Sequence, residues 1–407
     1  DIPIFIMFRA MGIITDSDII KYILIDVAEN DKFRYYQLLR GSLEESSHIT
    51  DQETAKEYLA KYVNMMGYNR DLSEQIRRMT YLKDILVNDF LPHVGTNITK
   101  KVYFLGLMVK TLLDVFLKKR NFDDRDSYSN KRVDTAGVLM SNLFRQYFTK
   151  LIKDMKTQVN KEFNGGSWRA TKKFQEIINM ANVYKCLKAS TISTGLKYAL
   201  ATGNWGLKTM ANKQGIAQVL SRLTYNSTQS HLRRVNTPME KTSKLVAPRK
   251  LHSTQFMRIC PSETPEGGSV GVVKNMALSC YITTYGDITP IIQILLSFDT
   301  QCIEDISPCN IGNRTKIFVN GDWILVTDKP QFITNKLKNM RRNGIINIYV
   351  SIVWNMYQNT LKIYTEAGRC SRPLYILENN KFKISYDMAN NIEKKIIGWN
   401  NLLFPEL

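Results

Sequence analysis

The sequence has few of the features that mark a metal-stabilised or secreted protein. Its six cysteines form no Cys-x-x-Cys pair and have no histidine at zinc-ligand spacing, so we predict no structural zinc site. In a long basic chain they are typical of reduced intracellular thiols, although an even number leaves a secreted protein open. No signal peptide is seen near Asp1, which favours an intracellular protein.

Long apolar runs and nucleotide-binding glycine motifs are also missing. The most apolar segment, residues 102–117, contains Lys110 and Asp114 and falls short of the ~18–20 uncharged residues that a membrane span needs. The spacing Gly267-Gly268-x-x-Gly271 misses both common phosphate-loop patterns. We therefore expect no membrane span, and we interpret these glycines as turn residues.

Negative charge is scarce relative to positive charge. The 407 residues include 56 Lys and Arg against 37 Asp and Glu, which gives a net charge of +19. This excess indicates a polyanionic partner, either nucleic acid or an anionic membrane surface; the alternative is a lysine-rich surface that keeps the protein soluble. The hydrophobic fraction of 44% is ordinary for a folded protein, and the length predicts roughly two to four domains.

The first half has the pattern of amphipathic helices. Thr15 with Asp18, and Thr50 with Glu53, are capping pairs that predict two helix starts. Apolar residues at helical spacing predict further helices at residues 75–90, 102–117, 139–163 and 168–188. The last two carry a basic face, which is either solvated or in contact with nucleic acid.

The last third mixes strands and helices. Residues 316–326 predict a β-hairpin, because Asn320-Gly321 supplies the positive φ angles of a type I′ turn. A short helix that ends at Gly344 follows, and then strands at residues 345–353 and 360–364.

Three aspartates, Asp123, Asp124 and Asp126, suggest a magnesium site, because hard cations take carboxylate ligands. The alternative, which we favour, is that they pair with neighbouring cations or cap a helix. The candidate cations are Arg125, Lys131 and Arg132.

The stretch from Leu223 to Cys280 is the strongest candidate for function. It contains a basic tip at residues 231–234, stiffening prolines, and the adjacent glycines Gly267 and Gly268. This combination is typical of a rigid loop held against a polyanion.

The same stretch resembles a known family. Residues 224–238, 248–252 and 263–267 are similar to the fork region of the second-largest subunit of multisubunit DNA-directed RNA polymerases, of the eukaryotic and giant-virus type. Further similar motifs occur in the expected order, at residues 124–134, 195–206 and 369–374, so the resemblance covers nearly the whole chain.

The resemblance implies an α+β multidomain fold with a helical N-terminal third and mixed α/β fork and external regions. It implies a lobe at residues 1–132, the C-terminal part of the protrusion at 133–201, the fork at 202–282 and the external domain at 283–407. The C-terminal half of the subunit has no counterpart here, so we expect a fragment or a split half.

The resemblance also implies functional residues. Lys213, Gln218 and Arg234 match positions that contact the template or the RNA–DNA hybrid, and residues 239–246 match a loop that keeps the non-template strand apart. Cellular relatives usually have glycines in that loop, so the mobility of the loop is left open here. They often have a histidine at the position of Ser127, so the contact made by that side chain is also left open. The expected nucleic-acid-binding residues are Lys213, Gln218, Arg233, Arg234, Lys241, Lys244, Arg249 and Lys250.

Arg249, Glu263 and Glu266 match positions near the active centre. The alternative for the two carboxylates is a buried ion-pair network with Arg249, Arg258 or Lys274 that only holds the loop in place. We expect no catalytic residue and no metal ligand in this chain.

These expectations define two functional hypotheses. The first is a portion of a nucleotidyltransferase that lines the active-centre cleft and is inactive alone. Its expected partners are the largest and other polymerase subunits, template DNA and the RNA–DNA hybrid, and no membrane contact is expected. Mg²⁺ is expected in the complete enzyme, held mainly by the largest subunit, with no cofactor on this segment. The second is a free-standing basic nucleic-acid-binding or scaffold protein. The expected location is intracellular: the nucleus for a cellular protein, or the virion, host cytoplasm or viral factory for a large DNA virus.

Overall fold

The computed structural model describes residues 2–63, 73–164, 187–207, 213–239, 243–378 and 380–398. The chain forms two compact units that are not continuous in sequence. Unit 1 combines Asp1–Arg125, Thr283–Ala367 and Pro373–Leu407, and unit 2 combines Asp126–Ile282 and Gly368–Arg372. Helices and several small sheets together make an α+β fold, which confirms the predicted fold class.

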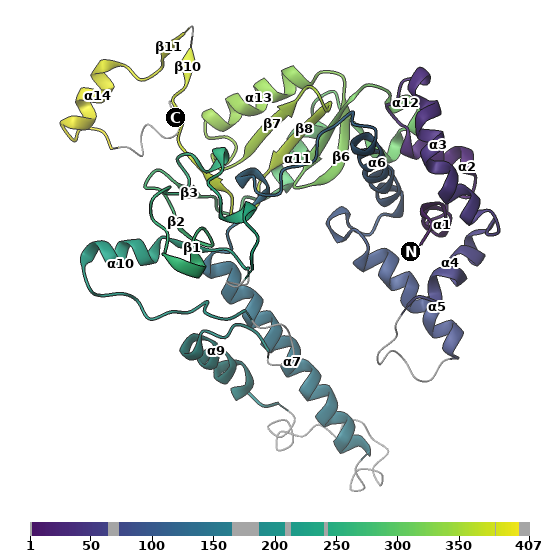
Figure 1. Ribbon diagram of the computed structural model, residues 1–407, viewed down its shortest axis with the longest axis horizontal. Helices are drawn as coiled ribbons and strands as arrows, with labels where there is room; N and C mark the ends of the chain where they lie inside the picture. The colour runs from purple at the N-terminus through teal and green to yellow at the C-terminus, as the bar shows by residue number, and fades with distance from the viewer. Residues whose placement is uncertain are drawn as a thin grey trace. The chain divides into compact units, whose positions relative to one another are not determined.

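Unit 1 begins with a group of helices around α1 (Figure 1). Phe5 and Phe8 of α1 are fully buried against apolar residues of α2, α3 and α6, which explains the apolar stripes of these segments. The helices are α1 (Ile4–Ala10), α2 (Asp16–Ile23), α3 (Glu29–Ser46), α4 (Gln52–Ala60), α5 (Glu74–Asp84) and α6 (Ile98–Phe116).

The two predicted helix starts have different outcomes. The Thr15 side chain accepts a hydrogen bond from the Asp18 backbone N–H at 3.2 Å, so the predicted cap of α2 is confirmed. The predicted cap at Thr50 is wrong, because Asp51 occupies the N-cap position of α4 and its side chain makes no capping hydrogen bond. A Thr or Asp can fill this position equally well, so composition alone placed the start one residue too early.

A mixed five-stranded sheet forms the other part of unit 1, in the order β4-β6-β5-β8-β7. The β5 and β8 strands run parallel and the other neighbours run antiparallel. Helix α13 lies beside β7, and apolar residues of α11 and α13 share a core with the sheet (Figure 1). The elements are α11 (Thr289–Leu296), β4 (Gln301–Cys302), α12 (Pro308–Ile311), β5 (Thr315–Val319), β6 (Asp322–Thr327), α13 (Pro330–Arg342), β7 (Ser351–Asn355) and β8 (Thr360–Tyr364).

The predicted hairpin is confirmed in β5 and β6. Asn320 and Gly321 have φ angles of 51° and 90°, as a type I′ turn requires. The predicted strand at residues 345–353 is wrong over its first six positions, because the chain turns at Asn347 before β7 begins. The Asn347 side chain accepts from the Tyr349 N–H, and the Val350 N–H donates to the Asn347 carbonyl, so local hydrogen bonds replace strand pairing.

Aromatic packing joins the helices of unit 1 to its sheet. Tyr103 of α6 lies edge-on to Trp323 of β6, with ring centroids 6.0 Å apart, and its hydroxyl donates to the Ile306 carbonyl. Both rings are buried with Ile303 and Phe318. Segments that are 200 residues apart in sequence therefore share one core, which explains why they form a single unit.

Unit 2 is built from α7 (Ala136–Asn164), α9 (Ser190–Thr202), α10 (Tyr225–Leu232) and two short antiparallel ladders. One ladder pairs β1 (Arg234–Asn236) with β2 (Val273–Asn275), and the other pairs β3 (Tyr281–Ile282) with β9 (Cys370–Ser371). The predicted helix at residues 168–188 lies outside the described residues except for its last two positions.

The last elements of unit 1 are β10 (Leu377–Glu378), β11 (Lys381–Phe382) and α14 (Tyr386–Glu393). Within the part of the chain that the structure describes, no helix has both the length and the apolar character needed to cross a bilayer.

Candidate nucleic-acid interface

The basic tip predicted at residues 231–234 lies where α10 meets β1. Thr224 caps α10 by accepting from the Ser227 N–H at 3.1 Å, and β1 then pairs with β2, with Arg234 opposite Asn275. The Asn275 side chain donates to the Ser230 carbonyl at 3.2 Å and to its hydroxyl at 2.7 Å. The tip is therefore held on both sides by backbone structure.

The paired arginines of the tip have different surroundings. Arg233 Nη2 donates to the Ala277 carbonyl at 2.6 Å and lies 3.5 Å from the Cys280 carbonyl, so its guanidinium group braces the chain. The Arg234 side chain is exposed and has no hydrogen-bond or ion-pair partner among the described residues. Arg233 is the C-cap residue of α10, whereas Arg234 is the first residue of β1, so the change of backbone conformation between them gives the two side chains different surroundings.

Lys213 and Gln218 lie in the segment before the tip. The Lys213 backbone pairs with Trp205, and its Nζ lies 3.3 Å from Asp134 Oδ2, with both side chains more than half exposed. Gln218 Oε1 lies 3.0 Å from His231 Nε2, while His231 Nδ1 accepts from the Ser221 N–H at 3.1 Å. His231 must then donate through Nε2, so it holds Gln218 beside α10.

This positioning role of His231 was missed by sequence reasoning. The residue belongs to the basic tip and was counted with its charge, but its ring connects two backbone segments. A signal was present, because a histidine can bond through both ring nitrogens to two different segments. Its partners lie 10 and 13 positions earlier, which no local pattern predicts.

Arg249 connects three parts of the segment from Leu223 to Cys280. Its Nη1 donates to the carbonyls of Gly268 at 2.7 Å and Val270 at 2.8 Å, and its Nη2 donates to the Ser243 carbonyl at 3.1 Å. Gly271 packs directly on the Arg249 backbone: its φ is 67°, and a Cβ at this position would lie 2.3 Å from the Arg249 carbonyl oxygen. Close backbone approach explains this glycine, in agreement with the predicted turn role.

The hypothesis of a buried ion-pair network around Glu263 and Glu266 is wrong. Both glutamates are exposed, and neither takes part in an ion pair among the described residues. The Ser230 hydroxyl donates to Glu263. The proposed cationic partners are satisfied by backbone carbonyls instead, with Lys274 donating to Pro248 at 3.0 Å and Arg258 to Thr254 at 2.8 Å. Tight turns bring these carbonyls close while the carboxylates point to solvent.

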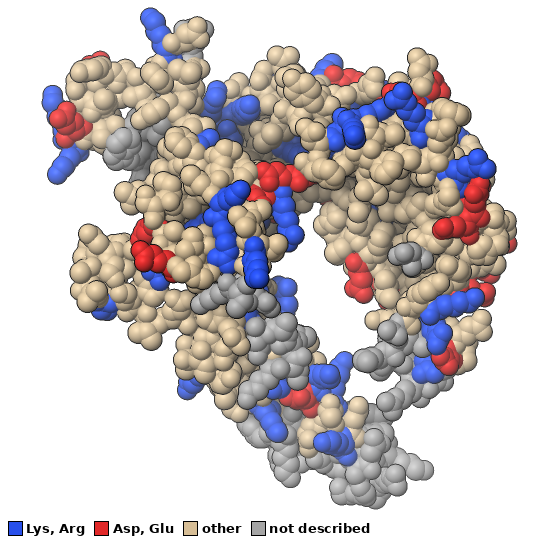
Figure 2. Space-filling model, in the orientation of Figure 1, with Lys and Arg blue, Asp and Glu red and all other residues tan. Residues whose placement is uncertain are grey.

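The remaining predicted contacts lie along the loop before Arg249. Lys244 and Lys250 are exposed. Lys241 lies outside the described residues, together with Glu240 and Thr242, so the predicted loop at residues 239–246 is described only in part. Figure 2 shows a group of Lys and Arg side chains beside β1 and β2 on the face in view.

The aspartate cluster contains ion pairs. Asp123 Oδ1 lies 2.9 Å from Arg120 Nη2, and Asp126 Oδ1 lies 3.8 Å from Lys131 Nζ. Among the described residues, no three His, Cys, Asp or Glu side chains are grouped as metal ligands. The described part of the chain therefore provides no carboxylate cluster that would hold Mg²⁺.

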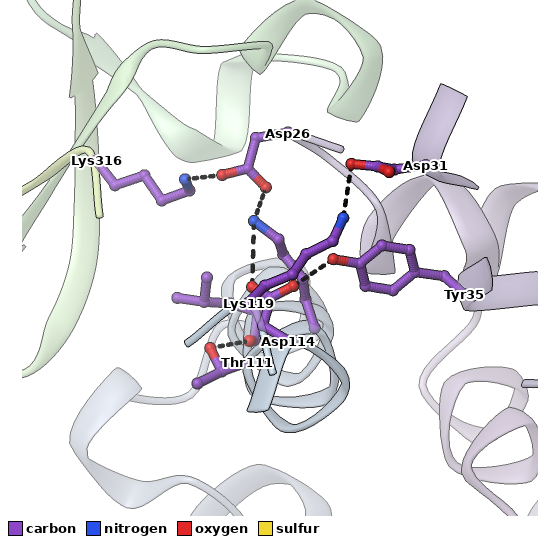
Figure 3. A network of polar contacts seen from close by, with 9 residues as sticks. Asp26, Asp31, Tyr35, Thr111, Asp114, Lys119 and Lys316 are labelled. Carbon is purple, nitrogen blue, oxygen red and sulfur yellow. Dashed lines mark hydrogen bonds and ion pairs between the residues drawn. The ribbon is translucent and has the colours of Figure 1, made fainter. Parts of the chain in front are cut away.

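Unit 1 uses its buried cations differently. In the network of Figure 3, Lys316 and Lys110 both bind Asp26, and Lys119 binds Asp31 at 2.7 Å. Burial alone would raise the pKa of Asp26, but Lys316 and Lys110 outweigh this effect and lower it. Lys316 and Lys110 are largely buried against Asp26, so they stabilise unit 1 and are not available to a polyanion, whereas Lys119 is exposed.

Comparisons with known proteins agree with this arrangement. Three family models match in order: RNA polymerase Rpb2, domain 2 at residues 1–134, domain 3 at residues 218–282 and domain 4 at residues 317–378. The chain belongs to the Rpb2 family of RNA polymerase subunits. The resemblance noted in the sequence is thereby confirmed, and the domain 3 match contains every predicted site residue except Lys213.

Relatives of this Rpb2-family chain span several eukaryotes and a giant virus. It is 41% identical over 411 residues to DNA-directed RNA polymerase II subunit 2 of Arabidopsis thaliana, covering 99% of the chain and 33% of that protein. It is 39% identical over 408 residues to subunit RPB2 of Encephalitozoon cuniculi, covering 99% and 34%. For DNA-directed RNA polymerase subunit 2 of Acanthamoeba polyphaga mimivirus the identity is 32% over 430 residues, covering 100% and 34%. The chain thus spans about a third of the length of these relatives.

Proposed function

We propose that this chain is part of the second-largest subunit of a DNA-dependent RNA polymerase, where it lines the active-centre cleft and contacts template DNA and the RNA–DNA hybrid. The observation that carries the proposal is the match to three successive Rpb2 domains, with an exposed, unpaired Arg234 on the ladder of the middle one. In the proposed division, residues 1–132 form the lobe, 133–201 part of the protrusion, 202–282 the fork and 283–407 the external domain.

The proposed site residues act by two routes. The first route is direct contact with phosphate groups, which does not depend on base sequence. The exposed cations suited to it are Arg234, Lys213, Lys244 and Lys250, and we add Lys241 because it carries the same charge. The others position the fork: Gln218 is held by His231, and Arg233 and Arg249 bind backbone carbonyls. Glu263 and Glu266 lie near the active centre in this proposal and take no part in proton transfer.

Chemistry in this proposal comes from the assembled enzyme. Phosphoryl transfer by nucleic-acid polymerases uses metal ions held by clustered carboxylates, and the described residues lack such a cluster. Mg²⁺ would therefore be held mainly by the largest subunit, which, with the other subunits, is the proposed protein partner. The proposed location is intracellular, in the nucleus or, for a virus, in the virion, host cytoplasm or viral factory.

The first experiment measures binding of the purified chain to an RNA–DNA hybrid at several salt concentrations. We expect sequence-tolerant binding that weakens steeply with salt, and no RNA synthesis. Arg234→Ala and Lys213→Ala should each lower the salt slope by about one unit. Lys336→Ala is the matched control, because it removes the same charge from an exposed position of α13 in unit 1. Affinity that is flat with salt, or equal losses in all three variants, would contradict the proposed contacts.

The second experiment separates the polymerase subunit from a free-standing basic protein with the same fold. Copurification with a largest subunit that carries the catalytic aspartates supports the first function. In the assembled enzyme, the double variant Lys213→Ala with Arg234→Ala should shorten the lifetime of the elongation complex and leave assembly intact. Loss of assembly would instead assign these residues a structural role.

A further inference from the structure

Cys280 and Cys370 meet in the core of unit 2. In the β3–β9 ladder Cys370 is opposite Ile282, and Cys280 directly precedes β3 and belongs to the same buried cluster as Cys370. The two thiols interact with each other. They are 6% and 8% exposed and share an apolar cluster with Tyr128 and Ile259. Both are free thiols in this structure.

Several arginines lie near this thiol pair, and two of them, Arg233 and Arg258, have no carboxylate partner among the described residues. Arg233 and Arg258 lie near Cys280, and each has a buried Nε that makes no hydrogen bond. The hydrogen bonds of their Nη groups go to backbone carbonyls. Arg372 lies close to Arg258, and Arg132 lies close to Cys370. Among the described residues, neither Arg233 nor Arg258 takes part in an ion pair, so an anion at Cys280 would be stabilised from two sides.

The interaction of the two thiols shifts their pKa values in opposite directions. The hydrogen bond with Cys370, together with the nearby Arg233 and Arg258, lowers the pKa of Cys280 below that of an ordinary thiol. The same hydrogen bond and burial raise the pKa of Cys370. A more acidic thiol beside a less acidic one is the arrangement of an attacking and a resolving cysteine.

We propose that Cys280 and Cys370 are a reversible oxidation site, at which a peroxide converts the two thiols into a disulfide across the β3–β9 ladder. The Cys280 thiolate attacks one peroxide oxygen and breaks the O–O bond, which gives a sulfenic acid and, after protonation, water or an alcohol. The Cys370 sulfur then attacks Cys280 Sγ, forms the S–S bond and loses its proton, and the sulfenic oxygen leaves as water. Both sulfurs together supply the two electrons that reduce the peroxide.

The position of the pair gives the disulfide a structural consequence. The chain leaves unit 2 after Ile282 and returns to it at Gly368, so the β3–β9 ladder closes the inserted segment Thr283–Ala367. The ladder has only two residue pairs, which makes local opening inexpensive and lets a small oxidant reach the buried thiols. A disulfide would replace this weak closure with a covalent one, and thiol reductants would restore the ladder. This inference does not depend on the polymerase function.

The experiment treats the reduced chain with increasing hydrogen peroxide, blocks the remaining thiols by alkylation and maps non-reduced peptides by mass spectrometry. We expect a peptide pair joined through Cys280 and Cys370, reversed by dithiothreitol, before Cys260, Cys302 or Cys309 is modified. Cys309 is exposed and is therefore the internal reference for unassisted oxidation. If Cys309 is oxidised while Cys280 and Cys370 stay reduced, the proposal is overturned.

Variants test the order of the two steps. In Cys370→Ser, Cys280 should accumulate as a sulfenic acid that dimedone traps, whereas in Cys280→Ser the Cys370 thiol should stay reduced. Arg258→Gln should slow the oxidation of Cys280 roughly three- to tenfold, and Arg258→Lys, which keeps the charge, should not. Equal oxidation rates in both Arg258 variants would show that the positive charge of Arg258 does not promote the oxidation of Cys280. If Arg258→Gln does not fold, the two cysteine variants are sufficient for the test. Failure of dimedone to trap a sulfenic acid at either cysteine would contradict the proposal.

Discussion

Lys316 Nζ lies 2.6 Å from Asp26 Oδ2, although the two residues are 290 positions apart in the sequence. Lys316 is 2% exposed and comes from β5, whereas Asp26 lies between α2 and α3 (Figure 3). A buried ammonium group is tolerated only when its charge is compensated. This pair therefore joins the N-terminal helices to the sheet in one arrangement.

Removing the charge of Asp26 should destabilise unit 1 strongly. Asp26→Asn leaves Lys316 and Lys110 buried without their shared carboxylate, and breaking such a pair costs about 3–5 kcal/mol. Urea unfolding of the chain measures the change in the free energy of unfolding. Glu44→Gln is the control, because its pair with Arg40 is exposed and should contribute little. Similar decreases in the free energy of unfolding for both variants would mean that the buried pair stabilises the chain no more than the exposed one.

The same carboxylate should make unit 1 sensitive to acid. The pKa of Asp26 is lower in the folded chain than in the unfolded chain, because Lys316 and Lys110 outweigh the effect of burial. Its stabilising contribution is complete above the unfolded pKa of about 3.9 and is lost as the pH falls through the lower folded value. Thermal unfolding between about pH 5 and about pH 2 should show a decline that is smaller in Asp26→Asn. Parallel curves for both proteins would exclude this role.

Gly271 and Gly267 form a matched pair for testing the packing around Arg249. Both have positive φ angles, but a Cβ at Gly271 would lie 2.3 Å from the Arg249 carbonyl oxygen, whereas nothing lies within 4 Å of one at Gly267. Both alanine variants carry the backbone strain, and only Gly271→Ala must also displace Arg249. We expect Gly271→Ala to lower hybrid affinity and the unfolding midpoint more than Gly267→Ala. Equal effects would show that strain, not close packing, is what these glycines relieve.

Two helical glycines should respond in opposite directions. A Cβ at Gly106 of α6 would lie 2.2 Å from the Tyr22 carbonyl oxygen, while one at Gly41 of α3 meets nothing within 4 Å. Gly41→Ala should raise stability by roughly 0.5–1 kcal/mol through lower unfolded-state entropy, and Gly106→Ala should lower it because α6 can no longer approach α2. Denaturant midpoints measure both. A stabilising Gly106→Ala would contradict the close α2–α6 contact.

Glu266 should be dispensable for proton transfer. It is exposed and makes no ion pair among the described residues, so Glu266→Gln removes a charge without leaving a buried partner. In the complete enzyme, single-nucleotide addition should change less than about a hundredfold, below the ~10²–10⁴-fold loss expected for a general acid or base. Glu263→Gln is the matched control in the same loop. A collapse with loss of a titrating limb in the pH profile would place Glu266 in the chemistry.

Local structure and family membership were determined by the sequence itself. The Thr15 cap, the Asn320-Gly321 turn and the end of α13 before Gly344 each depend on residues within a few positions of one another. The motifs that resemble the polymerase family could also be identified from the sequence, because residue order alone defines them. The error at Thr50 arose because Thr and Asp can both occupy an N-cap position, and the error at Asn347 arose because local turn hydrogen bonds replace strand pairing there.

What each charged group faces was decided only by the tertiary structure. Arg233 and Arg234 are adjacent and chemically identical, yet the first is the C-cap of α10 and donates to carbonyls, while the second begins β1 and is exposed. The two glutamates lost their expected partners because turns brought carbonyl oxygens to the cations first. Pairs such as Lys316 with Asp26 and Cys280 with Cys370 depend on where the chain returns after long excursions, and no pattern of nearby residues encodes that path.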